Sequence, residues 1–227
     1  MRQSAGDLSR FLDSLAALHL PNVFNPYAEI SSESDAEDAA NIRRENLRRV
    51  LFAAIDQGVD SMWIARDLGY RGGRRTGLAL TDDLHLNDHG HMFGVGPLTR
   101  PTVGPPVSER TATVIWRALA DIGRPIFLWN VFPLHPHAPG DPLTNRQHTK
   151  AEKEVSEYFL RWLVSKLRPT KCVALGRDAG VALRHFALDV EVHEVRHPSY
   201  GGQREFERSI YDLYDTARSS ERTLFST

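Results

Sequence analysis

Residues 60–77, which read DSMWIARDLGYRGGRRTG, are the stretch that decides the fold class of this chain. An apolar run at 62–65 stops at Arg66 and Asp67 and is followed by a segment that holds four glycines. A short apolar run bounded by glycines is typical of a buried strand that ends in a loop. We therefore expect Asp67 at the carboxyl end of the strand, which is where open α/β sheets place their ligand crevices.

The loop after this strand combines its glycines with three arginines, Arg71, Arg74 and Arg75. Glycine leaves backbone N–H groups accessible and guanidinium groups pair with phosphate, so the loop suits an anionic ligand. It is not a P-loop, because no Gly-Lys-Ser/Thr follows and the glycine spacing differs. The alternative is an ordinary turn between a strand and a helix, with glycines for geometry and arginines for solubility.

The rest of the chain alternates between apolar runs and helical patterns. Further strands are predicted at residues 125–134, 171–176 and 190–195. Apolar residues at helical spacing predict helices at residues 5–19, 36–57, 108–123, 149–167, 176–186 and 204–218. Ser108 is the expected N-cap of one helix, and Thr149 with Glu152 is the expected capping box of the next. Strands that alternate with helices favour an α/β fold with a mostly parallel sheet between two helical layers.

We expect a single domain over residues 1–227, which is long enough to bury a sizeable core. Its first part, residues 1–58, is predicted to be helical. Residues 78–107 are predicted to form a long connection on the side of the sheet that carries the ligand site. Connections of this length inside a compact domain are usually functional or mobile.

Composition excludes several classes of protein. The net charge is −1, so any contact with nucleic acid must come from a local basic patch. The single cysteine, Cys172, excludes an internal disulfide, a cysteine-ligated iron–sulfur cluster and a cysteine-based zinc site. No apolar run approaches membrane-spanning length and the N-terminus lacks the apolar core of a signal peptide. We expect a cytoplasmic monomer without a cofactor.

Three polar side chains are predicted at the carboxyl ends of separate strands, namely Asp67, Asn130 and His197. Each has a structural explanation when taken alone. Asp67 can pair with Arg66, Asn130 can satisfy a turn, and His197 can bind a backbone carbonyl. Because parallel strands end at one edge of a sheet, the three together favour a functional site.

Four short segments resemble motifs of the uracil-DNA glycosylase superfamily, and they occur in the order found in that family. They are ARDLGY at 65–70 with RGGRRTG after it, WNV at 129–131, LTNRQHT at 143–149 and RHPSY at 196–200. The resemblance spans residues 65–200, and it rests on joint order and strand context, because no single match is specific. It implies a three-layer α/β sandwich with a central four-stranded parallel sheet.

The resemblance also implies a role for each matching residue. Asp67 would stabilise the oxocarbenium character that develops on the sugar and orient or deprotonate water, and His197 would donate a hydrogen bond to the departing base. Asn130 would bind the hydrogen-bonding edge of a base flipped out of the duplex. The other expected base contacts are Gly69, Tyr70 and Leu80. The expected DNA contacts are Ser199, Tyr200 (which would press into the gap left in the duplex), Arg71, Arg74, Arg75, Arg146 and Arg204.

The first motif departs from the family pattern at three positions. Ala65 replaces a glycine, Leu68 replaces a proline, and Arg66 stands beside the acid. The usual base-stacking phenylalanine aligns best with Leu80, and an aromatic stack is worth about 1–3 kcal/mol per base. A pocket without that ring is less tailored to uracil, which motivates the hypothesis of a bulkier modified pyrimidine. Glucosylated hydroxymethylcytosine of phage DNA is one candidate, and it would give the protein a role in phage defence.

Three alternatives are kept. A module of the same fold could bind DNA or a damaged base without cutting, with Arg66 neutralising Asp67. A nucleoside or nucleotide hydrolase could use the same residues on a small free substrate. His85, His89 and His91 could hold zinc, although we expect no helix to fix their spacing and see no second pair of ligands. His135 and His137 are expected to flank the site as loop residues.

Overall fold

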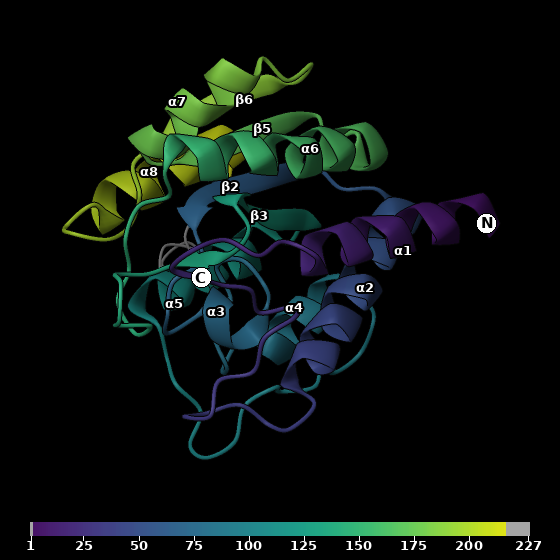
Figure 1. The fold of residues 1–227 in the computed structure, drawn as a ribbon. Helices are drawn as coiled ribbons and strands as arrows, with labels where there is room; N and C mark the ends of the chain where they lie inside the picture. Colours follow the sequence, from purple (N-terminus) through teal and green to yellow (C-terminus); the bar gives the residue numbers. More distant parts are fainter. Residues whose placement is uncertain (1, 217–227) are drawn as a thin grey trace.

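A parallel sheet of four strands lies at the centre of the computed structural model, which describes residues 2–216 (Figure 1). Its strands follow the order β3-β2-β5-β6 and are β2 (Ser61–Asp67), β3 (Ile126–Phe132), β5 (Lys171–Leu175) and β6 (Glu191–Val195). Ser61 of β2 is in register with Ile126 of β3 and Lys171 of β5. The four predicted strands and their parallel arrangement are confirmed.

Helices cover both faces of this sheet. One face packs against α1 (Arg2–Ala16), α2 (Ala39–Gln57), α6 (Lys150–Leu167) and α7 (Arg177–Phe186), and the other against α5 (Arg110–Ile122) and α8 (Gln203–Tyr214). Along β2, Met62 and Ile64 enter the first core while Trp63 and Ala65 enter the second, because successive side chains of a strand point to opposite faces. The expected three-layer α/β sandwich is confirmed.

Helix boundaries agree with the sequence to within a few residues. The capping box at the start of α6 is present, since the Glu152 N–H donates to Thr149 Oγ1 at 3.2 Å and the Thr149 N–H donates to Glu152 Oε2 at 2.6 Å. Helix α5 starts one residue later than predicted, and its N-cap is Glu109, not Ser108. Helix α8 ends at Tyr214, and the last part of its predicted span lies outside the described residues.

The long connection at 78–107 contains regular structure, so the expectation of an irregular loop is wrong for its central part. Helix α4 (Leu86–Met92) lies within it, and the short α3 (Gly73–Thr76) precedes it. Asp83 ties the connection together, because its carboxylate accepts hydrogen bonds from Arg75 and from the Val107 N–H. Elsewhere β1 (Val23–Phe24) and β4 (His135–Pro136) form a small antiparallel sheet.

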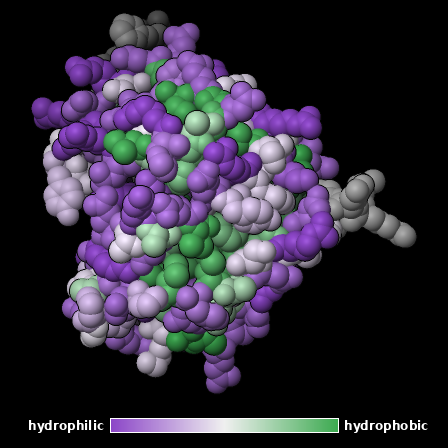
Figure 2. All heavy atoms as spheres, turned by 45° about the horizontal axis from the view of Figure 1, so that its top comes forward, coloured by the Kyte–Doolittle hydropathy of each residue, from purple (hydrophilic) through white to green (hydrophobic). Residues whose placement is uncertain are grey.

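The molecular surface is predominantly polar on the face shown in Figure 2, where apolar residues gather in groups between hydrophilic ones. Within residues 2–216, none of the helices has the length and apolar character needed to cross a membrane.

Candidate active site

A cavity of about 510 Å³ lies at the carboxyl edge of the sheet. Its walls come from the ends of β2, β5 and β6 and from the loops that follow them. The predicted site residues that line it are Asp67, Gly69, Leu80, Arg146, His197, Ser199 and Tyr200. The structure therefore brings the expected acid and the expected imidazole to one cavity, although they are 130 positions apart in the sequence.

The Asp67 carboxylate is held from two sides and its side chain is only 6% exposed. Its Oδ1 accepts a hydrogen bond from His148 Nδ1 at 2.5 Å, and its Oδ2 accepts one from Arg66 Nε at 2.7 Å. Arg66 also donates to Asp178 at 3.0 Å. Because an ionised carboxylate can only accept hydrogen bonds, Nδ1 of His148 is the donor in this contact.

The loop that carries His148 is anchored by Arg146. Both Glu152 carboxylate oxygens accept hydrogen bonds from Arg146, at 2.7 and 2.8 Å, and the carbonyls of Asn22 and His137 accept further ones. Asn145 Oδ1 accepts a hydrogen bond from the Tyr70 N–H at 3.0 Å. Arg146 was predicted to contact DNA, but its guanidinium is hydrogen-bonded to these partners and holds the loop beside Asp67.

His197 is neutral, and its own loop holds one nitrogen of its ring. Its Nδ1 accepts a hydrogen bond from the Ser199 N–H at 3.2 Å and lies 2.7 Å from Ser199 Oγ. Nδ1 is therefore the acceptor, and the proton of the neutral ring is on Nε2. Burial, with help from the charges of Arg66 and Arg196, lowers the pKa of His197 to about 4.

Asn130 does not reach the cavity surface. It lies inside β3, two residues before the strand ends, and not at its tip as predicted. Its register partner in β2 is Ala65, which does line the cavity. Asn130 is buried, and its Oδ1 has no hydrogen-bond partner among residues 2–216. An unsatisfied buried acceptor costs about 1–3 kcal/mol.

Leu80 and Glu109 form another part of the cavity wall. Leu80 has a φ of 56°, a backbone conformation that is uncommon for residues other than glycine. Burial, together with the charge of Asp82 and against the opposing effect of Arg71, raises the pKa of Glu109 to about 7. The sequence analysis did not select Glu109, because it lies far from every motif.

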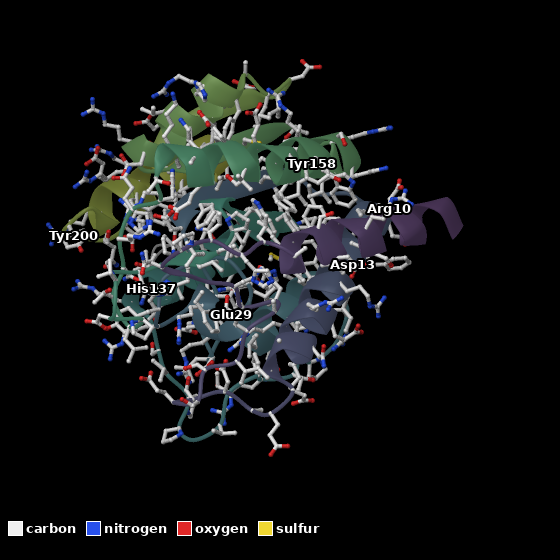
Figure 3. All side chains as sticks on the ribbon, in the orientation of Figure 1. Arg10, Asp13, Glu29, His137, Tyr158 and Tyr200 are labelled. Atoms are coloured by element: carbon white, nitrogen blue, oxygen red, sulfur yellow. The ribbon has the colours of Figure 1, made fainter. Side chains whose placement is uncertain are left out.

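The rim of the cavity carries exposed polar and aromatic groups. Tyr200 is 99% exposed, has a φ of 50°, and projects at the edge of the molecule (Figure 3). Arg177 and Arg196 line the cavity and are exposed. Arg71, in the loop after β2, and Arg204, in the first turn of α8, are also exposed but do not line the cavity. The sequence analysis selected neither Arg177 nor Arg196: Arg177 lies outside every motif, and Arg196 opens the RHPSY motif but was given no role there.

Arg74 and Arg75 are corrections to the predicted DNA contacts, because both are buried. The Arg74 guanidinium lies 4.3 Å from the centre of the Phe24 ring, and Arg75 forms an ion pair with the buried Asp83 at 2.7 Å. Tyr70 is half-buried and does not line the cavity. Buried guanidinium groups cannot reach phosphate, so these two arginines stabilise the loop and do not bind DNA.

The histidines of the 78–107 segment have separate partners. Helix α4 does carry His89 and His91, contrary to the expectation that no helix spans them. His85 Nδ1 lies 2.6 Å from Asp82 and His89 Nδ1 lies 3.0 Å from Thr81 Oγ1. No group of three or more metal-ligating side chains occurs in the described part of the chain.

The loop histidines predicted to flank the site have carbonyl partners. His135 Nδ1 lies 2.8 Å from the carbonyl oxygen of Leu68, a cavity residue, and His137 Nδ1 lies 2.9 Å from that of Ala138.

Solved structures with a similar fold are known. The fold is similar to that in the crystal structure of wild-type SMUG2 from Pedobacter heparinus, with a TM-score of 0.54 and 15% identical residues. The match covers 96% of this chain and 99% of the SMUG2 chain. At this identity the likeness shows a shared fold. No family model and no curated protein matches the sequence.

Proposed function

We propose that this chain is a DNA N-glycosylase that flips out an aberrant or modified pyrimidine and hydrolyses its N-glycosidic bond, leaving an abasic site. The observation that carries the proposal is the placement of Asp67 and the neutral His197 in one cavity at the carboxyl edge of the sheet. The shared fold with SMUG2, a member of the uracil-DNA glycosylase superfamily, supports the same reading.

The two groups match the charges that develop as the bond breaks. The bonding electrons leave with the base, so the sugar becomes cationic and the base anionic. The Asp67 carboxylate faces the sugar, and at about 4 Å and an effective dielectric constant of about 20 the attraction is worth roughly 4 kcal/mol. That corresponds to about three orders of magnitude in rate. The Nε2–H of His197 donates to the base oxygen on which the negative charge collects.

Water then adds to the anomeric carbon and must lose a proton. Asp67 orients this water and draws its proton, while the hydrogen bond from His148 fixes the direction of the carboxylate. The mechanism needs no metal or cofactor, since each charge is met by a side chain of this chain. Asn130, the register partner of Ala65, has an Oδ1 without a partner among the described residues, and we propose that a small shift brings this oxygen to the N–H groups of the base.

The groups on the rim support duplex binding. Arg71, Arg177, Arg196 and Arg204 are exposed and suit phosphate, and Ser199 lies on the same loop as Tyr200. Tyr200 is a solvent-exposed aromatic ring held in a strained backbone conformation, which suits a wedge that fills the space of the extruded base.

The substrate we propose is a pyrimidine larger than uracil. The cavity of about 510 Å³ and the aliphatic Leu80 at the expected stacking position both favour a bulky base, such as glucosylated hydroxymethylcytosine. Action on such a base would serve defence against phages that modify their DNA.

A second candidate function, a DNA-binding module without catalysis, is favoured by the ion pair between Arg66 and Asp67. A guanidinium on the acid reduces the negative charge that the cationic sugar would meet. The decisive experiment measures alkali-sensitive abasic sites in oligonucleotides that carry different pyrimidines, for the wild type and Asp67→Asn. Excision that the variant loses supports the glycosylase, and binding without excision supports the module. The same assay on free nucleosides tests for a nucleoside hydrolase, which would release the base from these small substrates.

A further inference from the structure

Glu109 is the third carboxyl group in the wall of the cavity, besides Asp67 and the more exposed Asp178. It belongs to neither β2 nor the loop after β6, and it contributes nothing to the chemistry described above. It is the N-cap residue of α5, so it approaches the cavity from the helical layer that contains α5 and α8. A polar group placed in a binding cavity without a catalytic task is a candidate for substrate recognition.

The backbone of Glu109 is anchored. Its N–H donates to Asp82 Oδ2 at 2.6 Å, and Oδ1 of Asp82 accepts hydrogen bonds from the N–H groups of Leu84 and His85. The Asp82 side chain is itself fully buried. The position from which the Glu109 side chain extends is therefore set by a network that does not depend on ligand binding.

The Glu109 carboxyl group lies against the glycines that follow Asp67. A Cβ atom on Gly69 would be 3.1 Å from Oε1, and one on Gly72 would overlap Oε2. Glycine at these two positions is what makes room for the carboxyl group beside the loop. Its oxygens accept no hydrogen bond or ion pair from another residue in the described range 2–216, so they are available to a ligand.

The chemistry of the cavity indicates the kind of ligand group. An unpartnered carboxylate is costly to bury, and it requires a hydrogen-bond donor. A cationic donor is disfavoured, because the four arginines in the cavity wall outnumber its three acidic side chains, Asp67, Glu109 and Asp178. A neutral hydroxyl group satisfies the carboxylate without adding positive charge. Burial and Asp82 keep the pKa of Glu109 near 7, and a hydroxyl group that donates to it would favour the ionised form.

We infer that Glu109 determines substrate specificity by accepting a hydrogen bond from a hydroxyl group on the substituent of the flipped-out base. This inference rests on the proposed function, and it adds the residue that recognises the hydroxyl groups of the substituent. Thymine and 5-hydroxymethyluracil make a sharp pair of probes, because they differ by a single hydroxyl group. 5-Methylcytosine with 5-hydroxymethylcytosine and its glucosylated form extend the comparison to larger substituents and to bases with an exocyclic amine.

The experiment compares wild type, Glu109→Gln and Glu109→Asp on duplexes that carry these bases. Excision rates are measured with normal nucleotides, and affinities are measured with 2′-fluoro nucleotides, which resist cleavage. We expect wild type to prefer at least one hydroxylated base over its methyl counterpart by at least tenfold in affinity. Glu109→Gln should remove most of this preference, while binding of thymine and 5-methylcytosine changes less than threefold.

Two results would overturn the inference: no preference of the wild type for hydroxylated bases, or an equal loss on methyl and hydroxymethyl bases in Glu109→Gln. The second result would show that Glu109 only shapes the cavity. Thermal unfolding shows whether Glu109→Gln is folded. If it is not, Glu109→Asp, which keeps the charge, is compared with the wild type instead. The affinity measurements test this inference independently of the proposed function, because they do not require excision. If the protein binds hydroxylated bases through Glu109 but excises none of them, the role of Glu109 in recognition stands and the proposed glycosylase activity is rejected.

Discussion

His148 Nδ1 donates a hydrogen bond to Oδ1 of Asp67 across 81 positions of sequence, at 2.5 Å. Both side chains are more than nine-tenths buried. The bond fixes one carboxylate oxygen, and Arg66 fixes the other. The orientation of the proposed catalytic acid is thus set by a residue outside its own strand and loop.

Replacement of His148 should impair the chemical step. In His148→Phe the carboxylate of Asp67 loses its fixed direction, and a small misplacement of a reacting group costs about 100-fold in rate. We expect the single-turnover excision rate to fall by about this factor, with DNA affinity changed less than threefold. His91→Gln is the control, since His91 is exposed on α4. A His148→Phe variant with normal excision would show that Arg66 alone orients the acid.

Asp67→Asn should nearly abolish excision while it leaves DNA binding intact. The substitution removes the negative charge from the sugar site but keeps the shape of the side chain, so we expect a loss of about 1,000-fold or more. Single-turnover excision and a binding titration on the same duplex provide the measurements. Equal activity of the variant and the wild type would exclude the proposed mechanism.

Tyr200→Ala should affect duplex substrates more than single strands. A wedge is needed only where the base must be extruded from a stacked helix, and unstacking costs a few kcal/mol. We expect at least a tenfold loss of excision from duplex DNA and less than threefold from single strands. Stability should not decrease, because the side chain is 99% exposed and its φ of 50° is strained. Equal losses on both substrates would point to a contact with the sugar or base instead.

The exposed and buried arginines should respond oppositely to substitution. Arg196→Gln removes a charge at the cavity rim, so we expect weaker binding to all duplex sequences and a salt dependence reduced by about one counterion. Its unfolding temperature should remain that of the wild type. Binding at several salt concentrations tests this, and an unchanged slope would remove Arg196 from the DNA interface.

Arg75→Gln should instead destabilise the fold. It leaves the buried carboxylate of Asp83 without its ion-pair partner, a change that typically costs about 3–5 kcal/mol. Urea denaturation of this variant beside Arg196→Gln provides the comparison. Retained stability together with weakened DNA binding would restore Arg75 to the DNA contacts predicted from the sequence.

Stability should decrease in mild acid through His89. Burial lowers the pKa of its folded form to about 3, whereas the unfolded chain binds a proton below about pH 6.5. The unfolded state therefore gains protons first, and the free energy of unfolding falls by about 1.4 kcal/mol per pH unit on that account. His89→Phe should show a shallower decrease between pH 6 and pH 4. Denaturation at several pH values tests this, and equal slopes would contradict it.

Local sequence patterns were sufficient for the fold. Strand and helix periods identified all four strands of the sheet, and the Thr149–Glu152 capping box placed the start of α6 correctly. Helix α4 was missed because a seven-residue segment with two histidines and a glycine lacks an apolar stripe. Asp67 and His197 were found because they follow apolar runs whose carboxyl ends meet at one edge of a parallel sheet.

The sequence by itself determined the order of the elements, the class of the fold and the two polar groups at the strand ends. Each of these follows from a short apolar run or from a helical repeat of 3.6 residues within one segment. Only the tertiary structure decided that His148 contacts Asp67, that Glu109 enters the cavity, and that Arg74 and Arg75 are buried. The physical reason is that burial and pairing depend on how segments distant in the sequence pack together. A charged side chain has the same local pattern whether it meets solvent, a ligand or a buried partner.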